Sequence, residues 1–453
     1  MRKLKLLLAA LCLLIGGGNN AWADTTKLLE TDGWTKITTI PTSSDIANNY
    51  YVFVDNSNDL MLGVAKGVNQ NTKWYSLGVY YQNSVEPTSA DINGKTWILE
   101  SNDGGFTMRN LEYSVLCLQT EWNAAWKFDT NDVQNPNEWS KINLSYLPEG
   151  YWTIQNGKYP ESGYLGPWND GNLNNGAECA TNKSGSNVGH FQIYAISRAK
   201  FKQNLIDNAS SSNIVDLTPW YVTNASFDAG NRNGWEGASS GSGGNNNTSF
   251  GGGCEIWNRS DFKLYQNLTL PNGKYKVSLQ MAGTENAGDV YGSSNGTTKQ
   301  AYSSVAGADN FQNTILAMIE NRSHGKAITD EITVSNGSLE IGMHGNAGGS
   351  KWLVFDNFKL YMTDPCLSAI ATDIPAATAT ALNANKWYKF TAASTDNYTF
   401  ATTTIGNIVY TSTDYLLSEA TGSAATATLP LTEGTTYYIK STTAQTLTIT
   451  PQT

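Results

Sequence analysis

Apolar and polar residues alternate with a period of two through most of the chain. The clearest runs are 275–281 and 353–361, and shorter ones continue to the C-terminus. Such alternation is typical of half-buried β-strands. Only one stretch, 197–209, has helical spacing, with Phe201 and Leu205 on one side. The pattern therefore predicts an all-β protein with a single amphipathic helix.

A weak repeat runs through residues 24–198. Its opening strands share an apolar start and a final asparagine: 52–56, 106–110 and 152–156. Its closing strands begin on an aromatic residue: Trp97, Trp139 and Phe191. A repeat of several strands at this period predicts three related units around one core. Large aromatic residues dominate such cores, so we expect Trp97 and Trp139 to be buried.

This repeat resembles the ricin-type β-trefoil, although none of its closing strands has the Gln-x-Trp element of that family. The resemblance implies a sugar pocket that combines an early aspartate with a nearby aromatic ring. The candidates are Asp55 and Asp59 in the first repeat, and Trp168 with Asp170 in the third. The alternative is a trefoil retained as a purely structural module.

A second domain is predicted over 217–364, after a helical and then Ser-rich linker at 199–216. It opens with Asn224-Ala-Ser-Phe-Asp228 and Gly234-Trp235, and it closes with Trp352-Leu-Val-Phe-Asp-Asn-Phe-Lys-Leu360. These two ends resemble the galactose-binding-like jelly roll of many carbohydrate-binding modules, over about a third of the chain.

The jelly-roll resemblance implies a structural calcium ion held by Asp228 and Asp356. Calcium prefers hard oxygen ligands, and carboxylates supply them. The alternative is that Asp356 only caps a turn.

A sugar site needs an aromatic ring face and polar partners for the hydroxyl groups. Candidate rings in the middle domain are Trp235, Trp257 and Tyr265. Candidate polar partners are Asn258, Arg259 and Gln266. The alternative is that these rings belong to the core, as aromatic residues of sandwiches usually do.

The remaining residues, 367–453, change to an Ala- and Thr-rich composition and contain six short strand patterns. They predict a small antiparallel β-sandwich. The stretch 431–439 resembles the end of the pre-peptidase C-terminal domains of secreted bacterial proteins, which implies an adhesive or spacer role. We expect a spacer.

The N-terminus has the layout of a secretory signal peptide over residues 1–23. Basic residues precede the apolar run 6–15, and Ala21-Trp22-Ala23 forms a small-residue cleavage pattern. We expect a secreted, cell-surface or periplasmic bacterial protein, with a retained membrane anchor as the alternative. No later segment is apolar enough to span a bilayer.

Charge and cysteine content narrow the range of partners. The signal contains three of the 29 Lys and Arg and none of the 39 Asp and Glu, so its removal takes the net charge from −10 to −13. A uniformly acidic chain repels phosphate backbones, which argues against a nucleic-acid partner.

Four cysteines remain after the signal: Cys117, Cys179, Cys254 and Cys366. Export permits the pairs 117–179 and 254–366. Free buried thiols are the equal alternative.

No catalytic motif is present. The three histidines are isolated, and the adjacent Asp330 and Glu331 would point to opposite faces of a strand. We therefore expect a non-enzymatic protein that binds polysaccharide or host glycans, with the oligomeric state left open. The alternatives are a structural or adhesive protein that binds other proteins, and a cryptic glycoside hydrolase.

Overall fold

A computed structural model describes most of the chain. The described residues are 25–65, 78–114, 117–119, 135–168, 173, 175–227, 231–237, 254–259, 261–303, 305–307, 313–314, 317–318, 325–345, 349–404 and 406–453. The segment expected to be a signal peptide lies outside them. Within these ranges no helix combines the length and the apolar character needed to cross a membrane. Nearly all regular structure is β, which confirms the expected all-β class.

The first domain contains one 11-stranded sheet that closes on itself, because β5 at the end of the strand path also pairs with β2. Its strands are β1 (Thr35–Lys36), β2 (Asn49–Asp55), β3 (Met61–Ala65), β4 (Gly78–Gln82), β5 (Trp97–Asn102), β6 (Gly105–Asn110), β7 (Ile142–Tyr146), β8 (Trp152–Asn156), β9 (Tyr164–Pro167), β10 (Ala177–Lys183) and β11 (Phe191–Ser197). Its short helices are α2 (Thr25–Thr31), α3 (Ser43–Asn48), η1 (Ile92–Lys95), η2 (Glu138–Ser140), η3 (Pro160–Ser162) and η4 (Gly185–Asn187).

Three strand pairings reproduce the internal repeat. The paired positions are Tyr51 with Trp97, Phe106 with Ile142, and Trp152 with Phe191. The expected closing position Trp139 is therefore wrong, and Ile142 takes it. Trp139 lies in η2, where it is 38% exposed, and the Lys158 ammonium sits 3.1 Å from its ring centroid. Trp97 is fully buried, as expected.

A buried polar residue lies four positions after each opening residue: Asp55, Asn110 and Asn156. Each side chain accepts hydrogen bonds from backbone N–H groups in the turn that follows its strand. The first repeat is thus shifted by one residue from the expected alignment, which placed Asn56 here. In this way a side-chain oxygen at the strand end accepts hydrogen bonds from turn N–H groups that have no partner on a neighbouring strand.

The middle domain packs two sheets face to face. One sheet contains β12 (Val215–Asp216), β14 (Cys254–Trp257), β16 (Gly273–Gly283), β19 (Lys326–Ile328), β20 (Ile332–Val334) and β22 (Trp352–Pro365). The other has the order β13-β15-β21-β17-β18, with β13 (Glu236–Gly237), β15 (Phe262–Thr269), β17 (Asp289–Ser294), β18 (Thr297–Ala301) and β21 (Ser338–Gly345). The expected buried strands at 275–281 and 353–361 are confirmed as parts of β16 and β22.

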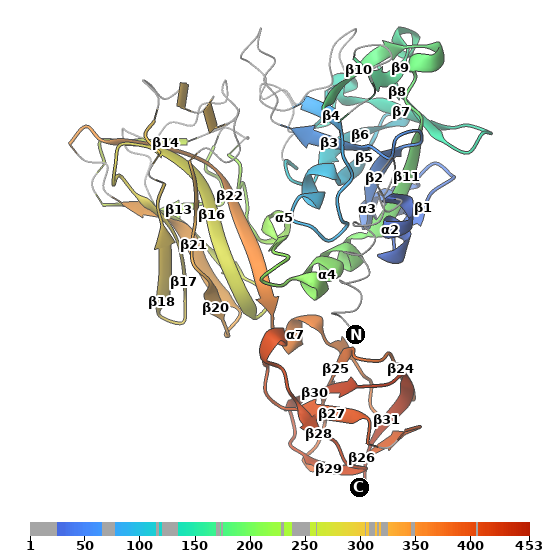
Figure 1. Cartoon of the computed structure of the whole chain (residues 1–453), viewed down its shortest axis with the longest axis vertical. Helices are drawn as coiled ribbons and strands as arrows, with labels where there is room; N and C mark the ends of the chain where they lie inside the picture. Colours follow the sequence, from blue (N-terminus) through green and yellow to red (C-terminus); the bar gives the residue numbers. More distant parts are fainter. Residues whose placement is uncertain are drawn as a thin grey trace, which may run out of the picture.

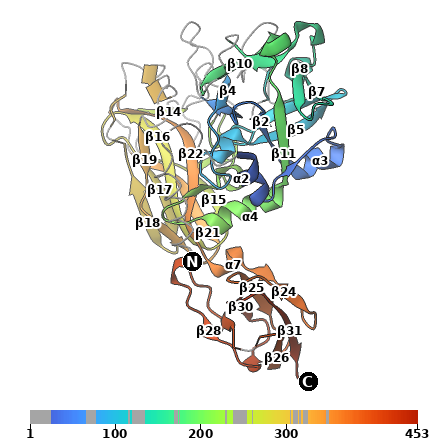
Figure 2. The same ribbon diagram turned by 45° about the vertical axis from the view of Figure 1, so that its right-hand side comes forward.

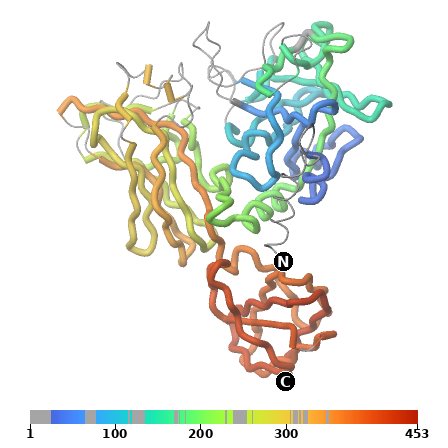
Figure 3. Tube along the Cα trace, in the orientation of Figure 1, coloured from blue at the N-terminus to red at the C-terminus, as the bar shows by residue number. Residues whose placement is uncertain are grey.

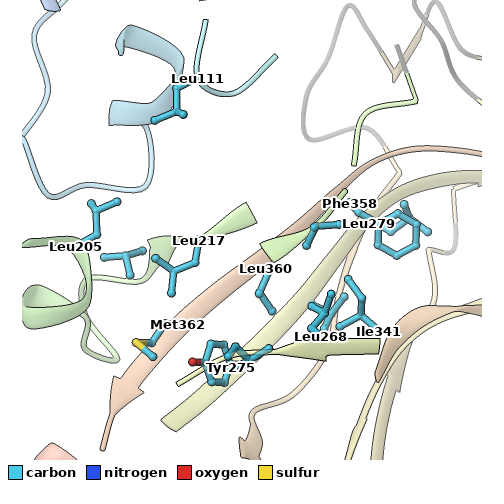
Figure 4. Packing of buried hydrophobic residues seen from close by; sticks show 14 of the residues in the cluster. Leu111, Leu205, Leu217, Leu268, Tyr275, Leu279, Ile341, Phe358, Leu360 and Met362 are labelled. Atoms are coloured by element: carbon cyan, nitrogen blue, oxygen red, sulfur yellow. The ribbon is translucent and has the colours of Figure 1, made fainter. Parts of the chain in front are cut away.

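The expected helix forms α4 (Arg198–Asn208), with Ser197 as its N-cap and Phe201 and Leu205 buried. It does not behave as a free linker. It packs, with α5 (Thr218–Tyr221), into one apolar cluster that the first and middle domains share. Figure 4 labels members of this cluster from the first domain (Leu111), from α4 and the segment after it (Leu205 and Leu217) and from β22 (Leu360 and Met362). We call the region where these parts meet the joint. Figures 1 and 2 show β22 beside this joint, and in Figure 1 β17 and β18 lie on the side away from the first domain.

An ion triad bridges the same joint. The Lys359 ammonium lies 2.9 Å from Glu112 Oε1 of the first domain and 3.0 Å from Asp216 Oδ2. The side chains are 17%, 13% and 3% exposed, respectively. The two carboxylates raise the pKa of Lys359 against the opposing effect of burial. First and middle domains are thus joined by an apolar core and by buried charge.

The C-terminal domain is a third lobe, orange to red in Figure 3, with its own core. One sheet contains β23 (Thr372–Asp373), β25 (Trp387–Thr391), β27 (Ile408–Thr411), β28 (Ser423–Ala424) and β30 (Thr436–Ser441). The other contains β24 (Thr380–Leu382), β26 (Asp396–Thr402), β29 (Thr428–Leu431) and β31 (Gln445–Pro451). Its helices are α7 (Leu367–Ile370) and η6 (Leu417–Glu419). An antiparallel sandwich was expected. One pair departs from this, because β23 pairs in parallel with β25.

The four cysteines of the described residues, Cys117, Cys179, Cys254 and Cys366, are all free and buried. Neither of the two permitted disulfide pairs forms. Burial raises the pKa of each thiol, so these side chains act as small apolar core groups.

Candidate functional site

The outer face of β13-β15-β21-β17-β18 carries an ordered set of polar and aromatic side chains. Strand alternation separates it from the core, because Leu264 and Leu268 of β15 are buried while Lys263 and Asn267 are exposed. Tyr265, between these two exposed residues, is half-buried on the same outer face. We call this surface the outer face of the five-stranded sheet.

Strand register arranges the outer face in three rows. The first row consists of Lys263, His344 and Asp289. The second consists of Glu236, Tyr265, Gly342, Tyr291 and Gln300. The third consists of Asn267, Glu340, Ser293 and Thr298. The middle row therefore has a glycine at its centre and a tyrosine on either side of it.

Gly342 places no side chain between the two tyrosines. A Cβ at this position would collide with the Leu264 carbonyl oxygen on the neighbouring strand. Tyr265 and Tyr291 pair with Gly342 from opposite sides. Two strand spacings place their backbones roughly 9.5 Å apart. Side chains stand roughly perpendicular to a sheet, so the two rings stand on either side of Gly342. Tyr291 is 3% exposed and Tyr265 is half-buried. We call the space between the two rings the slot, and the Lys263 side chain reaches into it.

Glu340 binds groups from both neighbouring strands. Its Oε1 accepts a hydrogen bond of 2.8 Å from the Tyr291 hydroxyl and lies 2.9 Å from the Lys263 ammonium. Burial, followed by the bond to Glu340, raises the pKa of Tyr291. The hydrogen bond to Glu236, followed by its charge, raises the pKa of Tyr265. Both phenols therefore stay protonated, and each is hydrogen-bonded to a carboxylate.

The first row adds a second carboxylate and an imidazole. Burial raises the pKa of Asp289, and the nearby His344 opposes this shift. The Tyr291 ring meets His344 edge-on at 4.8 Å between centroids. The Nε2 of His344 is buried and finds no hydrogen-bond partner among the residues that the structure describes. The face thus offers rings, acceptors and donors within three neighbouring strands.

Trp235, expected to be an exposed sugar platform, is instead a core residue. It is 9% exposed, and its ring centroid lies 4.3 Å from that of Phe358 and 5.6 Å from that of Phe227. Its Nε1 donates to the Asn224 carbonyl at 3.1 Å. Both the apolar and the polar parts of the side chain are therefore used inside the fold.

Gln266 is likewise structural and not a ligand partner. It is 6% exposed and points to the core side of β15. Its Nε2 donates to the Thr223 carbonyl at 2.7 Å, and its Oε1 accepts from the Thr223 N–H at 3.1 Å. The amide fixes the loop before Phe227 to the sheet.

Trp257 is 50% exposed and ends β14, opposite Trp352. Asn258 follows it in a left-handed conformation, and its Oδ1 accepts from the Ser350 N–H at 3.3 Å. Arg259 is half-buried. These residues lie at the edge of the other sheet, so they are separate from Tyr265, with which the sequence grouped them.

In the first domain, Trp168 is 42% exposed, while Asp170 lies outside the described residues. Asp55 is 2% exposed and its Oδ1 accepts from Ser57 and Asn58, so it holds a turn and is not available to a sugar. The aromatic candidate of the third repeat is therefore accessible, and its acidic partner is not described.

Calcium ligands were expected from Asp228 and Asp356. Asp228 lies outside the described residues. Asp356 is 1% exposed, and its carboxylate accepts from the Asn357 N–H at 2.7 Å and from Asn357 Nδ2 at 3.0 Å. The neighbouring loop is tied to this strand, because the Phe358 N–H donates to the Ala225 carbonyl.

Some of the oxygen atoms near Asp356 suit a hard cation such as calcium. The Oδ1 of Asn224 is buried with no hydrogen-bond partner in the described part of the chain. This unsatisfied oxygen belongs to the segment whose Ala225 carbonyl accepts from the Phe358 N–H, two residues after Asp356. No group of three or more His, Cys, Asp or Glu side chains suited to a metal gathers among the described residues. A complete ligand set would thus need backbone oxygens or Asp228.

Sequence reasoning missed most of the outer face. Lys263, Tyr291 and Glu340 lie on three different strands, and only the strand register brings them together. The one available signal was the alternation of β15, which puts Lys263 and Tyr265 on the same side.

Comparisons with known proteins identify no family. No protein-family model matches the chain, and no curated protein does. The solved carbohydrate-binding module TmCBM61, in complex with β-1,4-galactotriose, is 20% identical over 31% of this chain and 97% of that one, with a TM-score of 0.24. The cytolethal distending toxin of Haemophilus ducreyi is 14% identical over 35% and 88%, also at 0.24.

A mosquitocidal holotoxin is 11% identical, and the match covers 86% of this chain and 40% of that one, with a TM-score of 0.27. Scores this low assign no function. The function has to rest on the residues of this chain.

Proposed function

We propose that this is a secreted or cell-surface bacterial protein that binds glycans without catalysis, and that the glycan docks on the outer face of the five-stranded sheet. The observation that carries this proposal is the partly exposed Tyr265 ring beside Gly342, with the carboxylates of Glu236 and Glu340 near it. Aromatic faces suit the C–H groups of a pyranose, and carboxylates accept hydrogen bonds from its hydroxyls. Glu340 and Glu236 flank the slot as such acceptors.

The carboxylates of the face are poorly arranged for hydrolysis. Glycosidases set two carboxyl groups roughly 5–10 Å apart across the scissile bond. Asp289 and Glu340 lie on neighbouring strands but four residues apart in register. This offset separates their Cα atoms by about 14 Å. Glu340 is also already bound by Lys263 and Tyr291. These features support a binding role.

We also propose a structural calcium ion at Asp356, with Asn224 Oδ1 as a further oxygen ligand. Bound there, the ion would hold the loop that begins at Asn224 against β22. The first domain, joined to the middle one through their shared apolar cluster, would present a second surface to the same glycan or to another partner.

The full mature chain is the right material for the binding test, because an isolated middle domain would expose the apolar cluster it shares with the first domain. A glycan array would find ligands, and titration calorimetry would then compare Tyr265→Ala with Tyr164→Ala. Tyr164 is a half-buried tyrosine of the first domain and serves as the matched control. We expect Tyr265→Ala to lower affinity at least tenfold, in keeping with the cost of losing a stacking ring.

Two other results would contradict the assignment. Loss of binding in Tyr164→Ala alone would move the site to the first domain. Loss in Trp257→Ala with no effect of Tyr265→Ala would move it to the loop after β14. If no glycan binds a folded chain, the proposed function is wrong.

A further inference from the structure

The slot between Tyr265 and Tyr291 already holds an ammonium group, that of Lys263. Its Nζ lies 4.3 Å from the Tyr265 ring centroid and 5.8 Å from the Tyr291 ring centroid. The same atom lies 2.9 Å from Glu340 Oε1. One cation is therefore held by two aromatic rings and a carboxylate, which is the arrangement that proteins use for ammonium groups.

The surroundings of this ammonium are rich in negative charge. Glu236 lies beside Tyr265, and Asp289 lies in the row next to Tyr291. With Glu340, three carboxylates lie on the same face as Lys263, and His344 stands between Lys263 and Asp289 in the first row. Without the Lys263 ammonium the slot would be a strongly acidic aromatic pocket.

Lys263 is not locked into this position. Its side chain is 47% exposed, and the pair with Glu340, itself 25% exposed, is open to solvent. Exposed ion pairs contribute little to stability, so the side chain can leave the slot at small cost. Gly342 contributes no side chain to the space that the ammonium leaves.

We infer that the slot is an ammonium cage, that Lys263 is its intramolecular occupant, and that its external ligand is a glycan with free primary amines, a de-N-acetylated hexosamine chain. This inference rests on the proposed function and names the substrate class of the same face. A sugar ammonium would replace the lysine ammonium between the two rings, and its pyranose would lie against Tyr265. Because a ligand must displace the Lys263 ammonium to bind, Lys263 excludes ligands that carry no ammonium group.

Titration calorimetry on the full chain tests this with two probes, a glucosamine tetramer and its fully N-acetylated counterpart. Lys263→Met keeps the aliphatic stem and removes the ammonium. We expect it to bind the glucosamine tetramer at least tenfold more tightly than the wild type, with little change for the N-acetylated probe. Adding Glu340→Gln should abolish the gain, and raised salt should weaken it. Lys263→Gln serves as a second variant, and thermal melting checks that each variant folds.

The outcomes separate the two proposals. Equal effects of Lys263→Met on both probes, or none, would overturn the ammonium cage. If Tyr265-dependent binding of neutral glycans persists in that case, the proposed function stands and only the ligand class is wrong. If neither probe nor any array glycan binds the folded chain, both proposals are wrong.

Discussion

Replacing Lys359 by methionine should weaken the joint between the first and middle domains. The variant leaves the Glu112 and Asp216 carboxylates, 13% and 3% exposed, without their shared cation. Removing one partner of a buried ion pair costs about 3–5 kcal/mol. Because Glu112 and Lys359 retain some contact with solvent, and because the Thr218 N–H still binds Asp216 at 2.9 Å, we expect the lower end, about 3 kcal/mol.

Urea unfolding of the full chain, followed by tryptophan fluorescence, measures this loss as a lower midpoint at unchanged slope. Lys27→Met, an exposed lysine of α2, is the control and should change the unfolding free energy by less than about 0.5 kcal/mol. Adding Glu112→Gln to Lys359→Met should recover about 1 kcal/mol, because one of the two carboxylates that shared the lost cation is then neutral. A loss below about 1 kcal/mol in Lys359→Met would show that the triad contributes no more than an exposed ion pair.

Three further changes have defined outcomes. Asn156→Ala removes the acceptor of the Lys158 and Tyr159 N–H groups, so thermal melting should show a loss of about 1–3 kcal/mol in stability. Asn156→Asp should retain most of the stability, and equal melting of Asn156→Ala and wild type would argue against the role of Asn156 in the turn. The pKa of Asp289 is raised in the folded state, so its ionisation disfavours folding: relative to Asp289→Asn, the wild type should lose stability as pH rises through the ordinary aspartate range, and a pH-independent difference would contradict this. Calcium should raise the melting temperature of the wild type and a chelator should lower it, with neither effect in Asp356→Asn; an unchanged wild-type melting temperature would remove the proposed ion.

The sequence predicted those features that depend on local periodicity. Period-two alternation located the strands, and the spacing of Phe201 and Leu205 located α4 with its buried side. It could not show that α4 lies inside an apolar cluster common to two domains, because the partners, such as Leu360, are more than a hundred residues away. The first repeat was misaligned by one residue because Asp55 and Asn56 are both good turn residues, and only the register distinguishes them.

The candidate site was predicted only in part, for a similar physical reason. Tyr265 was predicted as a candidate ring from its surroundings in sequence and lies on the outer face. Trp235, which was grouped with it, is a core residue against Phe358. A tryptophan in a Gly-rich segment gives no local indication of which face it occupies. The pairing of Tyr265 and Tyr291 across Gly342 needs a three-strand register that no local pattern encodes.

Glycan binding by the full chain with and without the Tyr265 ring tests the central claim most directly. We predict that the mature protein binds a glycan measurably in calorimetry, and that Tyr265→Ala lowers its affinity at least tenfold while Tyr164→Ala leaves it unchanged. Equal affinities of wild type and Tyr265→Ala, in folded proteins, would contradict a site on the outer face of the five-stranded sheet.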